Sequence, residues 1–127
     1  MANTNRTKGH NLEREIARMF KEELEFKFAK TSRAASRVLD NCKVDIFGVP
    51  FLIQTKMGYA KARPKADLIF QEMDDLLKEN FPEEDKVHKY PKVLIHKMNG
   101  KNTGYHNLVT MPYNDWKFLL NKIKDSL

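Results

Sequence analysis

Three side chains in one short stretch, residues 43–56 (KVDIFGVPFLIQTK), could together act on a phosphate: the carboxylate of Asp45, the amide of Gln54 and the ammonium of Lys56. Carboxylate and amide oxygens suit a hard cation such as Mg²⁺, which keeps several waters and binds phosphate oxygens. A lysine beside such an ion can hold a phosphate or orient an attacking water. The spacing leaves a second interpretation open, in which Asp45 and Lys56 form a salt bridge that serves structure alone.

A small antiparallel hairpin would bring these three side chains together. Residues 44–47 and 51–55 are rich in β-branched and aromatic side chains and predict two strands, and the GVP sequence between them is typical of a turn. Pairing that is symmetric about this turn places Asp45 directly opposite Gln54, with Cβ atoms roughly 5 Å apart. Lys56 follows two residues later, so the pleat returns it to the same face.

A second carboxylate, Glu13, lies on a helix expected over residues 10–24. The apolar side chains of this segment recur at helical spacing and predict a buried stripe of Leu12, Ile16, Met19, Phe20 and Leu24. Glu13 falls on the margin of this stripe, beside Ala17 and Phe20. A carboxylate there either points into a site or is a boundary charge favoured near a helix N-terminus, and both interpretations stay open.

The composition predicts a single globular domain, residues 1–127, with residues 1–8 polar and flexible. Hydrophobic residues make up 41% and charged residues 31% of the chain, as in ordinary soluble proteins. No apolar run approaches the roughly 18 residues of a membrane span, and no secretory signal is evident, so we expect no membrane association. The single cysteine, Cys42, suits a reducing cytoplasm, in which the protein could be nucleoid-associated or phage-encoded.

The charge is concentrated in one half of the chain. The net charge is +6, and residues 1–65 hold 14 Lys and Arg against 7 Asp and Glu, whereas residues 66–127 hold 9 against 10. A one-sided positive field is what binding to a phosphate backbone requires.

Two basic segments lie on either side of the expected hairpin in the sequence: residues 30–43 precede it, and residues 57–65 follow it. Basic and hydroxyl side chains donate to phosphate oxygens, so we expect contacts with a nucleic-acid backbone to come from Lys8, Lys30, Ser32, Arg33, Ser36, Arg37, Lys61 and Arg63. From composition alone, residues 30–43 could equally be an ordinary solvated loop.

The remaining elements are expected to frame this site. Strands are predicted over residues 26–29, 92–98 and 103–110, the last two joined by an Asn-Gly turn. A helix over residues 64–80 should bury Leu68, Ile69, Met73, Leu76 and Leu77, and a helix over residues 114–124 should bury Trp116, Leu119, Leu120 and Ile123. The spacing of His88, His96 and His106 matches no metal-ligand pattern, so we expect solvent-facing or hydrogen-bonded histidines.

This order of motifs resembles the PD-(D/E)XK nuclease superfamily, and within it the archaeal-type Holliday-junction resolvases. The residues that carry the resemblance are KGHNLERE at 8–15, the Ser- and Arg-rich segment, VDI at 44–46 and QTK at 54–56, within residues 6–80. The resemblance implies an α/β fold with a restriction-endonuclease-like mixed central β-sheet flanked by helices, in the order α-β-β-β-α-β-β-α. It also implies a homodimer that acts on branched DNA.

The resemblance further implies the role of each site residue. Glu13 and Asp45 would be acidic metal ligands, Gln54 stands where the family usually has an acidic ligand, and the backbone carbonyl of Thr55 would add a further one. Lys56 matches the catalytic lysine. The implied cofactor is Mg²⁺, with Mn²⁺ as a substitute. Glutamine loses a charge but keeps a carbonyl ligand, and a Q-x-K triplet resembles that of Mrr-type restriction endonucleases.

We therefore expect a Mg²⁺-dependent endodeoxyribonuclease, with a Holliday-junction resolvase as the leading hypothesis. Two alternatives remain at this point. One is a catalytically silent DNA-binding module of the same fold, in which Gln54 marks the lost chemistry. The other is a restriction-type or phage nuclease that acts on linear duplex DNA.

Overall fold

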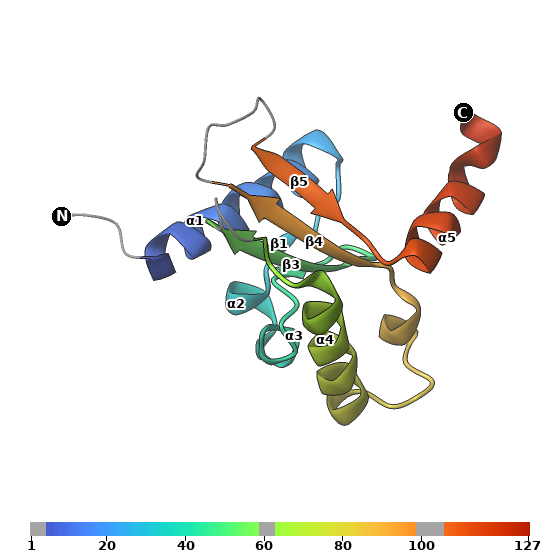
Figure 1. The fold of residues 1–127 in the computed structure, drawn as a ribbon, viewed down its shortest axis with the longest axis horizontal. Helices are drawn as coiled ribbons and strands as arrows, with labels where there is room; N and C mark the ends of the chain where they lie inside the picture. Colours follow the sequence, from blue (N-terminus) through green and yellow to red (C-terminus); the bar gives the residue numbers. More distant parts are fainter. Residues whose placement is uncertain (1–4, 59–62, 99–105) are drawn as a thin grey trace.

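The computed structural model describes residues 5–58, 63–98 and 106–127, and it is a mixed α/β structure (Figure 1). The elements follow in the order α1 (Asn5–Arg18), η1 (Met19–Glu23), β1 (Lys30–Thr31), α2 (Ser32–Ala35), α3 (Arg37–Asn41), β2 (Ile46–Phe47), β3 (Leu52–Met57), α4 (Ala66–Asn80), η2 (Lys86–Lys89), β4 (Lys92–Lys97), β5 (Asn107–Thr110), α5 (Tyr113–Ile123) and η3 (Lys124–Ser126). When the one-turn helices α2 and α3 and the η segments are set aside, the order of helices and strands matches the predicted one, although the first strand, β1, lies at Lys30–Thr31 and not at the predicted 26–29.

The strands form two small sheets. β3 and β4 run parallel, with Leu52 opposite Lys92 and Met57 opposite Lys97, and α4 forms the crossover between them. β5 adds an antiparallel edge to β4, which makes the three-stranded sheet mixed. β1 and β2 pair antiparallel in a separate two-stranded sheet.

The three-stranded sheet is covered on both faces because the side chains of β3 alternate between two apolar clusters. Ile53 packs with Ala17 and Phe20 of the α1–η1 segment, while Leu52 packs with Met73 and Leu77 of α4. Continuous apolar runs are typical of such doubly covered strands. The side chains of β3 are thereby divided between an α1 face and an α4 face, and this division positions the candidate site.

The predicted hairpin pairing is wrong. β2 pairs with β1, and a backbone hydrogen bond of 2.7 Å from the Asp45 N–H to the Ile53 carbonyl oxygen links this segment to β3. The carbonyl of Asp45 accepts the N–H of Ser32 at 2.8 Å instead of a second bond from β3. The backbone of β1 therefore competes successfully for the edge of β2.

The N-terminal helix begins earlier and ends differently than predicted. α1 starts at Asn5, so residues 5–8 belong to this helix, while residues 1–4 lie outside the described part. The predicted burial of Leu24 is wrong, since Leu24 is 53% exposed. The last turn, η1, is a π-helix, whose wider turn moves later side chains off the α-helical stripe.

Two further element assignments and one burial prediction differ from the structure. Residues 26–29 form a turn and no strand, because Glu25 adopts a positive φ of 62° and the chain reaches β1 only at Lys30. The basic segment 30–43, expected as a loop, holds β1 and two short helices. On α4, Leu68 is exposed, whereas Met73 and Leu77 are buried as expected.

The C-terminal half shows one confirmed strand and one wrong burial prediction. β4 matches the predicted strand, and β5 covers the end of the next one; the predicted turn at 99–102 and residues 103–105 lie outside the described residues. α5 forms as predicted but buries none of its residues, and Trp116 is 48% exposed. Within the described residues, no helix combines the length and apolar character needed to cross a bilayer.

Candidate active site

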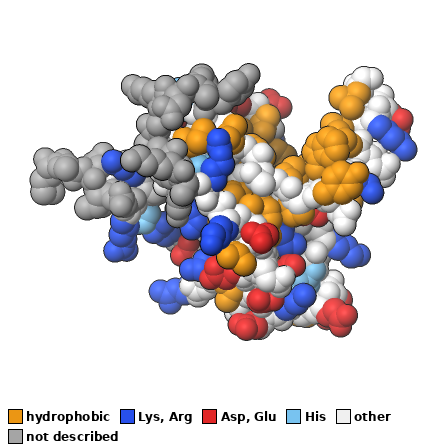
Figure 2. Space-filling view, in the orientation of Figure 1, with side chains coloured by type: hydrophobic (Ala, Val, Ile, Leu, Met, Phe, Trp, Pro, Cys, Tyr) orange, Lys and Arg blue, Asp and Glu red, His pale blue; other side chains and the backbone are white. Residues whose placement is uncertain are grey.

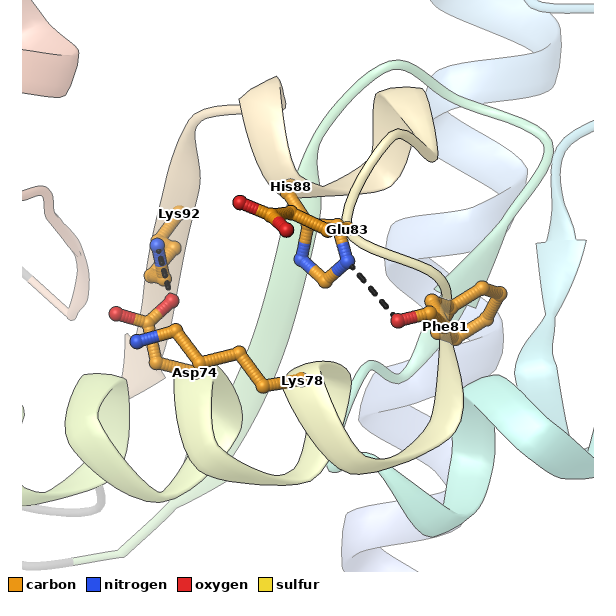
Figure 3. A pocket seen from close by; sticks show the side chains of 6 residues that line it. All are labelled: Asp74, Lys78, Phe81, Glu83, His88 and Lys92. Atoms are coloured by element: carbon orange, nitrogen blue, oxygen red, sulfur yellow. Dashed lines mark hydrogen bonds and ion pairs between the residues drawn. The ribbon is translucent and has the colours of Figure 1, made fainter.

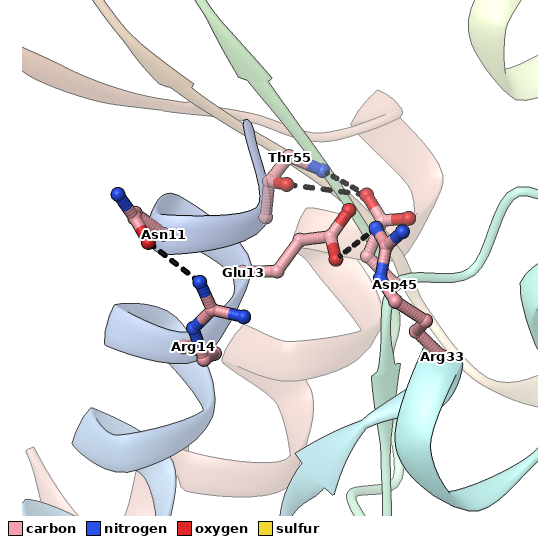
Figure 4. Close-up of polar contacts among 6 residues, drawn as sticks. All are labelled: Asn11, Glu13, Arg14, Arg33, Asp45 and Thr55. Carbon is pink, nitrogen blue, oxygen red and sulfur yellow. Dashed lines mark hydrogen bonds and ion pairs between the residues drawn. The ribbon is translucent and has the colours of Figure 1, made fainter. Parts of the chain in front are cut away.

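Asp45 stands where the two sheets meet. Its backbone bonds to Ile53 on one side and to Ser32 on the other, which fixes the direction of its side chain. The carboxylate oxygen Oδ2 accepts the backbone N–H of Thr55 at 2.8 Å and the Thr55 hydroxyl at 3.2 Å (Figure 4). Asp45 is thus held against the middle residue of the QTK triplet, and its carboxylate lies beside Thr55, not directly across from Gln54.

Glu13 reaches the same place from α1. It is 9% exposed, and Oε2 accepts a charge-assisted hydrogen bond from the Arg33 guanidinium at 2.7 Å (Figure 4). Arg33 belongs to α2, which the β1–β2 sheet holds next to Asp45. The structure therefore brings Glu13, Asp45, Thr55 and Arg33 together from four separate elements.

The electrostatics of this cluster are unfavourable for a second negative charge. The pKa of Asp45 is raised from 3.8 to about 7; burial is the largest cause, and the carboxylates of Glu13 and Asp40 act in the same direction. The N–H and hydroxyl of Thr55 act against this increase but do not cancel it. A proton or a cation near Asp45 would relieve the cost of its ionisation.

Gln54 and Lys56 lie on the other face of β3. Because side chains alternate along a strand, both share the α4 face with Leu52, whereas Thr55 shares the α1 face with Ile53. Gln54 is buried, and Lys56 is half-buried in a cavity of about 430 Å³ that Arg63, Lys65 and Glu72 also line. The ion pairs among the described residues do not include one between Asp45 and Lys56, so the purely structural salt bridge is absent there.

The basic and hydroxyl residues expected at the DNA backbone are placed unevenly. Lys30, Arg37 and Arg63 are exposed, and Lys8 is half-buried. Ser32 is fully buried, its hydroxyl oxygen without a hydrogen-bond partner in the described structure, and Ser36 caps α3 by accepting the N–H of Leu39 at 3.3 Å. Lys61 lies outside the described residues. The role of all these residues toward DNA stays a prediction.

Two carboxylates are enough for some metal sites but not for others. The described residues contain no group of three or more His, Cys, Asp or Glu side chains that could hold a metal ion. Mg²⁺, however, is often bound by one or two carboxylates, with water and substrate phosphate as the other ligands. Glu13 and Asp45 fit this requirement, since a divalent cation would offset the repulsion that raises the pKa of Asp45.

A larger hollow lies away from these residues, between α4 and η2 (Figure 3). Its volume is about 540 Å³, and three of its polar side chains have partners. Lys92 Nζ pairs with Asp74 Oδ1 at 2.8 Å, and His88 Nε2 contacts the carbonyl oxygens of Phe81 and Pro82 at 3.3 and 2.9 Å. The two carboxylates of this hollow, Asp74 and Glu83, are half-buried and exposed, so it holds no buried carboxylate comparable to Glu13.

The histidines are placed as the sequence predicts. His88 is hydrogen-bonded, His96 is buried with Nε2 at 2.8 Å from Gly58 O, and His106 is exposed.

Sequence reasoning missed two contributors to the cluster. Arg33 was expected at DNA, but it is the partner of Glu13 across 20 positions of sequence, a separation for which no local pattern exists. The side chain of Thr55 also takes part, whereas only its carbonyl was expected. Asp40, whose carboxylate helps to raise the pKa of Asp45, could have been noticed in the sequence, because it is the only acidic residue in the basic segment 30–43.

Comparisons with protein-family models, with curated proteins and with solved structures found no match to this chain.

Proposed function

We propose that this chain is a Mg²⁺-dependent endonuclease that hydrolyses DNA phosphodiesters, with branched DNA such as a Holliday junction as its preferred substrate. The proposal includes a restriction-endonuclease-like arrangement of the sheet, a homodimer that brings two sites to opposing strands, and action in the cytoplasm. The observation that carries it is the pair of carboxylates, the buried Glu13 and the half-buried Asp45, each held by residues distant in sequence. Buried carboxylates are costly unless a cation or proton accompanies them.

Each residue has a role in the proposed reaction. Glu13 and Asp45 would hold the metal, with water and substrate phosphate as further ligands. The motif also predicts Gln54 and the Thr55 carbonyl as ligands, but the Gln54 side chain lies on the α4 face of β3, away from Asp45. When bound, Mg²⁺ would activate a water and offset charge on the scissile phosphate. The N–H and hydroxyl of Thr55 keep Asp45 oriented. Mn²⁺ would substitute for Mg²⁺ because it also accepts oxygen ligands.

Phosphate binding would come from the basic groups near these residues. Lys56, Arg63 and Lys65 line one cavity at the start of α4, where the helix N-terminus adds a favourable dipole for an anion. Lys56 would contact the phosphate next to the scissile bond, while Lys8, Lys30 and Arg37 would contact the backbone further away. The excess of positive charge in residues 1–65 supports this assignment.

A second function, a DNA-binding module without catalysis, is favoured by a specific contact. The Arg33 guanidinium already forms an ion pair with the Glu13 carboxylate at 2.7 Å, and Gln54 supplies no negative charge. In this alternative Arg33 would neutralise the carboxylates permanently, and DNA binding would be independent of divalent ions.

The experiment that separates the two functions is cleavage of a labelled four-way junction beside a matched linear duplex, in Mg²⁺ and in Mn²⁺. Asp45→Asn keeps the shape of the side chain but removes its charge, and we expect it to lower the cleavage rate by about 100-fold or more. Asp75→Asn, an exposed change on α4, is the matched control and should cleave like the wild type.

Binding to both substrates is measured in parallel in chelator. The nuclease proposal requires that the wild type and Asp75→Asn cleave and that Asp45→Asn binds but does not. If the wild type binds the junction without cutting it in either ion, the catalytic proposal fails and the binding module is favoured. Faster cleavage of the linear duplex than of the junction would instead favour the restriction-type or phage nuclease.

A further inference from the structure

The C-terminal helix α5 presents an apolar face that none of the described residues buries. α5 extends away from both sheets (Figure 1), and apolar side chains gather along it (Figure 2). Tyr113, Trp116, Ile123 and Leu127 are 69%, 48%, 45% and 87% exposed, and together with the half-buried Leu120 they recur at alternating steps of three and four residues. Such spacing gives one continuous stripe along a helix, which is normally buried against another surface.

A groove on the same chain has matching properties. It lies between the α1–η1 segment and strands β4 and β5, with a volume of about 520 Å³. Its apolar lining is provided by Ile16, Met19, Ile95 and Val109, and Val109 is 63% exposed although it is a β-branched residue on a strand. The groove is therefore open and apolar, and it ends at the free edge of β5.

The charges around the two surfaces are complementary. The groove is lined by three glutamates, Glu15, Glu22 and Glu23, against one cation, Arg18. On the C-terminal helix, Lys117 follows Trp116 by one residue and Lys124 follows Leu120 by four residues. Helical geometry therefore places both lysines along the same margin of the apolar stripe. An apolar stripe with basic margins fits an apolar groove with acidic margins.

We propose that α5 is an exchanged arm, and that the α5 helix of one copy packs into the α1–β5 groove of a second copy, reciprocally. Such an exchange is symmetric, so the same two surfaces are covered in both copies. Aromatic side chains bury about 150–250 Å² each, so the stripe offers on the order of 500 Å² per arm. With the groove counted, two arms would cover about 2,000 Å², the size of a stable interface.

Two other uses of α5 are less favourable. Docking into the groove of the same chain is opposed by the first turn of α5, where Asp115 Oδ2 accepts the backbone N–H of Lys92 at 2.9 Å and holds the helix pointing outward. Direct α5–α5 pairing would use about two heptads, fewer than the three or four that a coiled coil needs. It would also bring the margins of Lys117 and Lys124 against each other.

The mass of the full chain in solution tests this proposal, which does not rest on nuclease activity. Sedimentation equilibrium of the wild type should give twice the chain mass of 14.9 kDa. Trp116→Glu on the arm and Val109→Glu in the groove should each raise the dimer dissociation constant by about 30-fold or more. Phe118→Ser is the matched control, because Phe118 is 44% exposed on the opposite side of the same helix. It should leave the dissociation constant within about twofold.

A charge exchange tests the geometry of the contact. Glu22→Lys and Lys124→Glu should each weaken the dimer severalfold, and the double variant should recover most of the loss. Three results would overturn the proposal. The first is a wild type that stays monomeric at about 100 μM. The second is a dimer insensitive to Val109→Glu, as α5–α5 pairing would give. The third is a monomer whose melting temperature falls in Trp116→Glu, as docking within one chain would give.

Discussion

The substitution Asp45→Asn should make the protein more stable than the wild type at pH 8, and this gain in stability should be smaller at pH 5. Asparagine keeps an oxygen that can accept the Thr55 N–H but removes the ionisation that burial disfavours. The pKa of Asp45 is about 7 in the folded protein and near 3.8 when exposed. Between these values the unfolded chain releases this proton while the folded chain retains it, so the free energy of unfolding falls as the pH rises.

The size of the effect follows from the two pKa values. A tenfold change in proton affinity corresponds to about 1.4 kcal/mol, so the contribution of Asp45 declines by about 3 kcal/mol between pH 5 and pH 8. For a domain of this size, a difference of that order corresponds to roughly 10 °C in melting temperature. The asparagine variant lacks this decline, and the gap between the two proteins should open as the pH rises.

Urea unfolding of both proteins at pH 5, 6, 7 and 8, without divalent ions, measures the gap directly. Asp75→Asn serves as the control, because its exposed carboxylate should give a difference that does not change with pH. A gap between Asp45→Asn and the wild type that is constant across the range would refute the reasoning. It would mean that Asp45 ionises as readily in the folded chain as in the unfolded one.

Three further predictions concern the same region. Mg²⁺ at millimolar concentration should stabilise the wild type at pH 8 by about 1–3 kcal/mol in urea unfolding and leave Asp45→Asn nearly unchanged; equal stabilisation of both would place the ion elsewhere. Gly48→Ala should lower the free energy of unfolding by about 2–4 kcal/mol, because Gly48 has a φ of +85° and an added Cβ would collide with the carbonyl oxygen of Phe28. Gly9→Ala is the control, since a Cβ added at Gly9 meets open space. Equal losses of stability in the two variants would contradict the prediction. Ser32→Ala should be neutral or stabilising by up to about 1 kcal/mol in thermal unfolding, since the buried hydroxyl has no hydrogen-bond partner in the described structure; a clear loss of stability would reveal a bond to that hydroxyl.

The elements with strong local patterns could be predicted from the sequence. α4 was found because its apolar residues recur at helical spacing, and β4 because it is a short continuous apolar run. Glu13 was placed at the edge of the buried stripe, and it is buried beside Ala17 and Phe20. A local pattern was sufficient in these cases because each element packs on the sheet with the face that its period defines.

The parts that depend on distant partners could not be predicted. The strands β1 and β3 could each form backbone hydrogen bonds with β2, and the sequence of β2 itself is compatible with either partner. The contact between Glu13 and Arg33 requires α2, a helix of four residues that no periodicity indicates. The exposure of α5 has the same origin, since an apolar stripe predicts that a helix is covered but not by which chain.

The hydrogen bonds of Asp45 join the two sheets, and the structure can open locally at this junction. Among the described contacts, Asp45 bonds to Ile53 in one sheet and to Ser32 beside the other, while its carboxylate binds Thr55. Separating the two sheets breaks these bonds together, so the amides of Ser32, Asp45 and Thr55 should exchange their hydrogens as one cooperative unit. Ionisation of Asp45 lowers the free-energy cost of that opening, so local unfolding at the junction of the two sheets should depend on pH near neutrality.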